Sequence, residues 1–126
     1  MVLPSEEARR RFVILEHNHP FLHWDLLMER DGALASWRLL QPVVCGQWID
    51  AEVLPDHRMM YLDYEGPVSR DRGSVKRIAG GTFRQLTAVT GPTDSTTTSF
   101  ELADCELAMQ AMLRTRTDCP PQWRFE

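Results

Sequence analysis

The segment from Phe21 to Glu29 has the strict side-chain alternation that is typical of a β-strand. Its two faces carry Leu22, Trp24, Leu26 and Met28 on one side and Phe21, His23, Asp25 and Leu27 on the other. The dipeptide Asp31-Gly32 follows, and it suits the positive φ angles of a two-residue hairpin turn. We therefore expect the segment from Leu34 to Leu40 to return as the second strand of an antiparallel hairpin.

The rest of the chain contains further short apolar segments separated by Gly, Pro, Asp or Ser. They are Phe12 to Glu16, Val43 to Val53, Met59 to Asp63, Val75 to Ile78, Gly81 to Leu86, Thr97 to Leu102 and Glu106 to Arg114. The last of them also has a composition that suits a helix, and the pattern around it favours a strand. Thr93 to Ser99 is expected to be a hairpin loop. Many short strands at close spacing indicate an all-β domain, either an antiparallel sandwich or a barrel.

The length of 126 residues fits one domain. Residues 1–11 are polar and end in three arginines, so we expect an N-terminal arm before a single domain of residues 12–126. The apolar stretches are far shorter than the roughly 20 residues that cross a bilayer, and no basic region followed by an apolar run marks a secretory signal. A monomer in the cytoplasm, without membrane contact, is the expectation.

Cysteine content and net charge argue against several classes of protein. Cys45, Cys105 and Cys119 are odd in number and lack Cys-x-x-Cys spacing, which argues against a disulfide framework and against a zinc knuckle. The net charge of −4 argues against a broad electrostatic grip on nucleic acid. A local contact with one phosphate remains compatible with this charge. Lys76 is the single lysine among 14 basic residues, and the planar guanidinium groups of the others suit phosphate or carboxylate.

Histidines are crowded near the first strands, where His17, His19 and His23 fall within seven positions. A strand projects His23 and Asp25 from one side, about 7 Å apart along the chain. The turn from Asn18 to Pro20 can bring His17 beside them. Two imidazoles and one carboxylate suit an intermediate divalent metal and leave positions open for water and substrate. The alternative is a set of ordinary interstrand or surface histidines, although burying such a polar face without a partner costs several kcal/mol.

His57 and Tyr61 form a second pair with chemical potential. They are four positions apart, which puts them on one face if Asp56 to Leu62 is extended. An imidazole and a phenol can donate hydrogen bonds to phosphate oxygens or protonate a leaving group. Taken alone, Tyr61 also fits a core position with its hydroxyl at the rim. The pair gains meaning only if it faces the metal.

Several blocks of sequence resemble the 3′-phosphoesterase domain of bacterial DNA ligase D. Phe12 to His17, Leu22 to Asp25 and Met28 to Trp37 are similar to the family's opening His, its Leu-His-aromatic-Asp segment and its Glu-x-Asp-Gly-x-Leu-x-Ser-Trp hairpin. The likeness continues through Asp56-His57, Tyr61, Asp63 to Gly66, Gly73 to Val75, Gly81 to Phe83, Phe100 to Leu102 and Trp123. The resemblance thus extends over nearly the whole chain.

The resemblance implies a small antiparallel β-barrel with short flanking helical or irregular segments. It implies that His17, His23 and Asp25 bind a divalent metal, most often Mn²⁺, with Zn²⁺, Co²⁺ or Fe²⁺ as alternatives. Asp25, His57 and Tyr61 would act in catalysis, the last two through phosphate contact or proton transfer. The family removes 3′-terminal phosphates and ribonucleosides from nucleic-acid ends in DNA repair. No polymerase or ligase module fits in the length, so we expect a stand-alone domain that works with a DNA ligase or polymerase in trans.

The chain departs from the family at Leu27, where the family has an arginine two residues after the metal-binding aspartate. A guanidinium there would hold the phosphate through two hydrogen bonds, which a leucine cannot do. The candidates to replace it as phosphate contacts are Arg30, Arg58, Arg70 and Arg72.

Two alternatives to a phosphoesterase follow. Because of Leu27, the first is a weak or inactive relative that binds phosphorylated ends or a repair partner. The second is a non-haem iron oxygenase that uses His23, Asp25 and His57 as its metal ligands, which would leave His17 without a role.

Overall fold

The computed structural model of the chain describes residues 9–91 and 94–126, which form nine strands and one short 3₁₀ helix. The elements are β1 (Arg10–His17), β2 (His23–Arg30), β3 (Ala33–Leu39), β4 (Trp48–His57), η1 (Met59–Leu62), β5 (Gly66–Pro67), β6 (Ser74–Thr90), β7 (Thr96–Ala103), β8 (Gln110–Arg116) and β9 (Cys119–Phe125). β1 begins two residues before the predicted start at Phe12. Positions 1–8 of the expected N-terminal arm, residues 1–11, lie outside the described residues.

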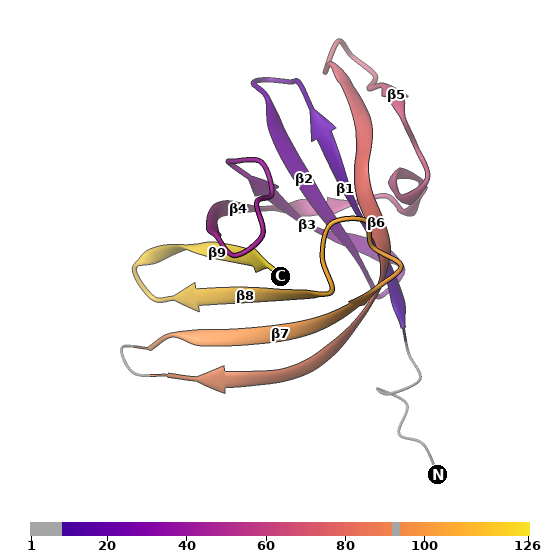
Figure 1. The fold of residues 1–126 in the computed structure, drawn as a ribbon. Coiled ribbons are helices and arrows are strands. Elements are labelled where there is room, and N and C mark those ends of the chain that lie inside the picture. The colour runs from indigo at the N-terminus through magenta and orange to yellow at the C-terminus, as the bar shows by residue number, and fades with distance from the viewer. Residues whose placement is uncertain (1–8, 92–93) are drawn as a thin grey trace.

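The described strands form one antiparallel sheet in the order β1-β2-β3-β4-β9-β8-β7-β6-β5. β1 also pairs with β6, from Arg10 opposite Phe83 to His17 opposite Val75, and this pairing closes the sheet into a barrel-like ring. In Figure 1 the ring is seen with β1, β2 and the start of β6 rising on one side and β7, β8 and β9 below. The predicted antiparallel all-β class is confirmed.

The hairpin predicted around Asp31-Gly32 is present. β2 ends at Arg30 and β3 begins at Ala33, which lies directly opposite it. Asp31 and Gly32 have φ angles of 52° and 81°, as a two-residue turn with left-handed central residues requires. Because such a turn fixes the register, every cross-strand pair between β2 and β3 follows from its position.

Two strands predicted between the hairpin and residue 63 need correction. The strand predicted from Val43 to Val53 begins only at Trp48, because the chain first turns at Gly46, whose φ is 85° and whose N–H donates to the carbonyl oxygen of Phe125. Met59 to Asp63 is not a strand, since residues 59–62 form η1. Met59, Tyr61 and Leu62 all pack on one apolar cluster, and the alternation of a strand would send neighbouring residues to opposite sides.

Val75 to Ile78 and Gly81 to Leu86 were predicted as separate strands and are one, the 17-residue β6. The glycines between them do not break the strand. A Cβ at Gly80 would lie 2.9 Å from the carbonyl oxygen of Phe12, and one at Gly81 would lie 2.2 Å from that of Ala103. These glycines therefore permit close approach of the neighbouring strands, which is a recognised use of glycine within a strand.

The C-terminal half follows the predicted strand pattern with shifted boundaries. Thr97 to Leu102 lies within β7, and the ambiguous segment from Glu106 to Arg114 is a strand only from Gln110 onward. The loop predicted at Thr93 to Ser99 is shorter than expected, because β7 already begins at Thr96. Its first residue, with residue 92, lies outside the described residues.

All three cysteines are free, as the sequence predicted. Within residues 9–91 and 94–126, the structure contains no helix with the length and apolar character needed to cross a membrane.

Alternation along β1 and β2 divides the buried side chains between two apolar clusters. The larger cluster is built from eight of the nine described strands and includes Phe12, Ile14, Leu26, Met28 and Trp123. The smaller cluster lies on the opposite face of β1 and β2 and contains Val13, Leu15, Leu27, Leu34, Leu62 and Val75. η1 and the segment after it cover the smaller cluster. The side chains at positions 17, 23 and 25 continue along this second face.

Candidate functional site

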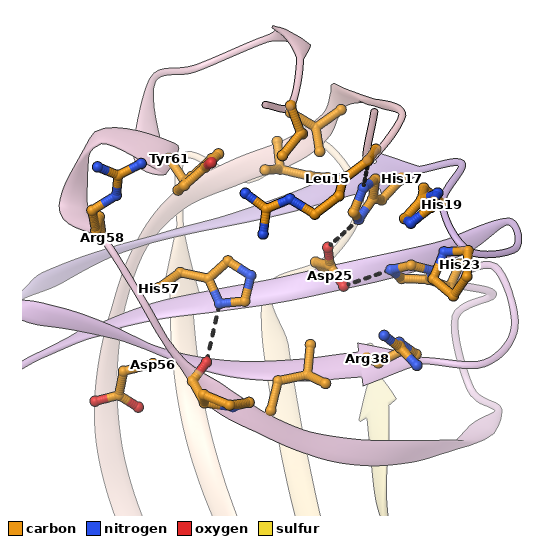
Figure 2. Close-up of a pocket in the computed structure, with 16 residues that line it drawn as sticks. Leu15, His17, His19, His23, Asp25, Arg38, Asp56, His57, Arg58 and Tyr61 are labelled. Carbon is orange, nitrogen blue, oxygen red and sulfur yellow. Dashed lines mark hydrogen bonds and ion pairs between the residues drawn. The ribbon is translucent and has the colours of Figure 1, made fainter. Parts of the chain in front are cut away.

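Three candidate metal ligands converge where β1 ends and β2 begins. His17 lies directly opposite His23, so their side chains share a face of the sheet, and Asp25 follows two positions along β2 on the same face. The two rings lie 4.8 Å apart between centroids, and one ligand atom from each of the three residues lies within 4.8 Å of the others. Figure 2 shows both histidines beside Asp25. Strand periodicity thus produces the cluster that the sequence led us to expect.

Backbone carbonyl groups orient both imidazoles. Nε2 of His17 lies 2.8 Å from the carbonyl oxygen of Arg72, and Nδ1 of His23 lies 2.8 Å from that of Phe21. Because a carbonyl oxygen only accepts, each of these ring nitrogens carries a proton and donates it. In neutral rings, the nitrogens on the other side then present lone pairs toward Asp25. Metal-binding histidines are commonly oriented in this way.

Asp25 presents its carboxylate to these lone pairs. Its oxygens lie 3.2 Å from Nδ1 of His17 and 3.0 Å from Nε2 of His23. The residue is only 3% exposed, and Oδ1 accepts no aligned hydrogen bond from the described residues, although the His23 nitrogen is near. Burial lowers the pKa of His23, against the opposing effect of Asp25, and this favours the neutral ring. Two buried residues and the half-buried His17 thus direct three acceptors at one another without a donor between them, and a divalent cation satisfies such a set.

The cluster lies in a cavity of about 420 Å³. Leu15 and Val75 line it from the sheet, and Val68 lines it from the segment that follows η1. Further polar lining comes from β3, from the end of β4 and from η1. The cavity is therefore large enough to hold a phosphate group together with part of the molecule that carries it.

His57 and Tyr61 line the same cavity, and their ring centroids are 5.8 Å apart. The pairing was predicted for an extended segment from Asp56 to Leu62. That prediction is wrong, because β4 ends at His57 and Tyr61 lies in η1. Nδ1 of His57 donates to the carbonyl oxygen of Pro55 at 3.1 Å. Neither the other ring nitrogen nor the Tyr61 hydroxyl has a hydrogen-bond partner in the described part of the chain. Both groups are thus available to a bound molecule.

The four arginines proposed as phosphate contacts differ in position. Arg58 and Arg72 line the cavity, whereas Arg30 and Arg70 are not part of its wall. Arg30 instead lies 3.4 Å from the carboxylate of Asp56. The Arg72 guanidinium donates to the carbonyl and hydroxyl oxygens of Ser69, at 2.8 and 3.1 Å. Of the four, Arg58 is the cavity residue whose guanidinium has no such partner among the described residues.

Leu27, where the resemblance implies an arginine, has no exposed surface and belongs to the smaller apolar cluster. Among the described residues, the ligand set suggested for an oxygenase is not the one that converges, because the cluster contains His17 and not His57.

The cavity residues that the sequence analysis did not predict as contacts include His19 and Arg38. Arg38 lies directly opposite Asp25 on β3. This pairing was predictable from the sequence. A two-residue turn at Asp31-Gly32 pairs Arg30 with Ala33, and the same register five residues further from the turn on each strand pairs Asp25 with Arg38. The ring of His19 lies 6.4 Å from that of His17 at the mouth of the cluster.

A family model described as the DNA ligase D 3′-phosphoesterase domain matches residues 15–115. The match includes all three clustered residues as well as His57 and Tyr61. Comparison with curated proteins gave no match.

Proposed function

Since the chain belongs to the DNA ligase D 3′-phosphoesterase domain family, with residues 15–115 matched, we propose that it is a divalent-metal-dependent phosphoesterase. Its proposed substrates are nucleic-acid ends that carry a 3′-terminal phosphate or ribonucleoside. The product would be a 3′-hydroxyl end, which a DNA ligase or polymerase acting in trans in the cytoplasm could use.

The observation that carries this proposal is that His17, His23 and Asp25 direct three acceptor atoms at one another. Each imidazole is fixed by a backbone carbonyl, and the buried Oδ1 of Asp25 lacks an aligned donor. These residues would hold the metal, and Mn²⁺ is the ion we propose. When bound, such an ion supplies positive charge for the phosphoryl oxygens and lowers the pKa of water.

The chemical step would transfer the phosphoryl group to water. A water oxygen forms the new bond to phosphorus, the bond from phosphorus to the 3′ oxygen breaks, and the leaving oxygen takes a proton to become the hydroxyl. His57 and Tyr61 stand across the cavity and are the residues we propose for donating that proton or for binding phosphate oxygens. Nε2 of His57 and the Tyr61 hydroxyl have no competing partners in the described residues, which supports this assignment.

The test is hydrolysis of a 3′-phosphorylated primer with Mn²⁺ by the wild type, His23→Ala and a control. Arg114→Ala is suitable as the control, because Arg114 lies on β8 outside the cavity, with its guanidinium over the ring of Trp48. We expect phosphate release by the wild type and the control, and none by His23→Ala. Mn²⁺ binding is followed in parallel by the electron paramagnetic resonance signal of the free ion.

Two other results would change the assignment. Binding of Mn²⁺ and of phosphorylated ends without any turnover would favour the inactive end-binding relative, for which Leu27 is the argument. If the wild type and His23→Ala behave alike on every phosphate ester tried, the proposed phosphoesterase is wrong.

A further inference from the structure

Arg38 brings a cation to the wall of the cavity beside the three clustered residues. It lies on β3 directly opposite Asp25, and directly opposite residues of neighbouring strands share a face of the sheet. In Figure 2 Arg38 lies next to His23 and Asp25, on the far side of the cavity from Tyr61. A molecule that contacts His57 and Tyr61 on one side and the cluster on the other would therefore meet Arg38.

The hydrogen-bonding capacity of Arg38 is largely unused. Its Nε is buried without a partner, and its nearest carboxylate, Glu52, lies 3.7 Å from a terminal nitrogen, beyond hydrogen-bond distance. In the described residues its guanidinium makes no hydrogen bond. The side chain is only 23% exposed, so water satisfies it poorly. A half-buried cation with free donors is costly unless an anion completes it.

Phe21 holds Arg38 in this position. The guanidinium carbon lies 5.3 Å from the centroid of the Phe21 ring, within the range of a cation–π contact. The carbonyl oxygen of the same residue accepts the proton of His23 Nδ1. One residue of the turn before β2 thus positions both the cation and one of the clustered imidazoles.

We propose that Arg38 binds the phosphate of the substrate, and that it supplies from β3 the cation that is absent at Leu27 on β2. The inference rests on the proposed function for the identity of the phosphate as a 3′-terminal one. The other cations are less suited to this role. Arg72 already donates to Ser69, Arg30 lies beside Asp56, and Arg58 is exposed at the opposite end of the cavity.

The experiment measures equilibrium binding of two primers, identical except that one ends in a 3′-phosphate and the other in a 3′-hydroxyl. Fluorescence anisotropy is recorded for the wild type, Arg38→Met, Arg38→Lys and Arg114→Ala. Methionine keeps an unbranched stem against Phe21 and removes the charge. Arg114→Ala is a matched control, because that guanidinium also lies over an aromatic ring, 4.0 Å from the centroid of Trp48, but away from the cavity. Circular dichroism and thermal unfolding establish that each variant is folded.

We expect the wild type and Arg114→Ala to prefer the phosphorylated primer, and Arg38→Met to lose about 10- to 100-fold of that preference, as the loss of charge-assisted hydrogen bonds predicts. Arg38→Lys should keep part of the preference, since an ammonium acts on phosphate as a point charge. If folded Arg38→Met prefers the phosphorylated end as strongly as the wild type, or if the wild type has no preference, the inference is wrong.

Hydrolysis by the same proteins separates this inference from the proposed function. Suppose that the preference of the wild type for the phosphorylated primer depends on Arg38, but that the wild type hydrolyses no phosphate ester. The phosphate-binding role of Arg38 would then stand, and the proposed phosphoesterase activity would be wrong. If the wild type hydrolyses the primer and Arg38→Met prefers the phosphorylated primer as strongly as the wild type does, only the role of Arg38 is wrong.

Discussion

The side chains of β1 and β2 alternate between two faces of the sheet, and the two faces differ in what they contain. On one face Phe12, Ile14, Leu26 and Met28 all enter the larger apolar cluster. On the other, Val13, Leu15 and Leu27 enter the smaller cluster, and the next residues along the same face are His17 and Asp25. Two steps along a strand, about 7 Å, therefore separate an apolar core from a polar site.

This difference shows how a small sheet can support both stability and chemistry. The face with Phe12, Ile14, Leu26 and Met28 provides burial that needs no hydrogen bonds, whereas the other face places polar groups against an apolar support. Side chains backed in this way are held in fixed orientations, as a preorganised site requires. We expect substitutions on the apolar face to change stability alone. Those at the polar end of the other face should change binding and turnover.

The largest effect is expected from Asp25→Asn. Loss of the carboxylate should lower phosphate release by about 1000-fold, on the order of 4 kcal/mol in activation free energy, since the metal would lose a charged ligand. Without metal, the unfolding midpoint should stay level or rise, because an amide N–H can donate to the imidazole lone pairs and a buried charge is removed.

Enzyme assays with Mn²⁺ and thermal unfolding in a chelator measure the two effects of Asp25→Asn. Asp118→Asn is the control, since that residue is exposed in the turn between β8 and β9. A variant that keeps its activity and loses stability would make Asp25 a structural residue and remove the contrast between the faces.

A pair of core substitutions compares the apolar parts of both faces. Leu26 and Leu27 are neighbours in β2, are 1% and 0% exposed, and belong to different clusters. We expect Leu26→Ala and Leu27→Ala each to lower the unfolding free energy by about 2–5 kcal/mol, as cavity-forming substitutions do. Urea denaturation measures both. A cost below about 1 kcal/mol for Leu27→Ala alone would mean that the smaller cluster is loosely packed and gives the site little support.

The sequence was sufficient to predict the hairpin, the antiparallel class and the clustering of His17, His23 and Asp25. All three depend on local rules, namely alternation along a strand and the conformation of an Asp-Gly turn. The same rules also specify Arg38 as the partner of Asp25 across the turn. In this region the local pattern determines which side chains meet.

Elements whose form depends on distant contacts were not predictable. β6 continues through Gly80 and Gly81 because the backbones of β1 and β7 approach there, and no neighbouring residue signals that approach. η1 is a 3₁₀ helix because Tyr61 and Leu62 both pack toward the smaller cluster, a surface that exists only after the sheet has formed. The juxtaposition of His57 and Tyr61 was expected for a wrong reason, since the two lie in different elements.

Glu106 is a second carboxylate, to be compared with Asp25, and its substitution is expected to have the smallest effect. It precedes β8, pairs with the guanidinium of Arg77, accepts from the N–H of Gly80 at 3.2 Å, and is 49% exposed. The hydrogen bond from Arg77, and after it those from backbone N–H groups, lowers the pKa of Glu106 from 4.5 to about 2. Unlike Asp25, this carboxylate has aligned donors and water around it, so we expect its removal to lower stability, but only slightly.

We expect Glu106→Gln to lower the unfolding free energy at pH 7 by less than about 1 kcal/mol, because exposed ion pairs are screened by solvent. A depressed pKa gives stability that is fully present above the unfolded-state pKa near 4.5 and is lost as the pH falls toward 2. The difference between wild type and variant should therefore shrink over that interval in urea titrations. The interaction with Arg77 is tested in the Arg77→Met background. There Glu106→Gln should lower the unfolding free energy by less than it does in the wild type. If the difference in unfolding free energy stays constant from pH 7 to pH 2, the stability lost in Glu106→Gln comes from side-chain packing. The charge of the carboxylate would then not explain why Glu106 and Asp25 differ.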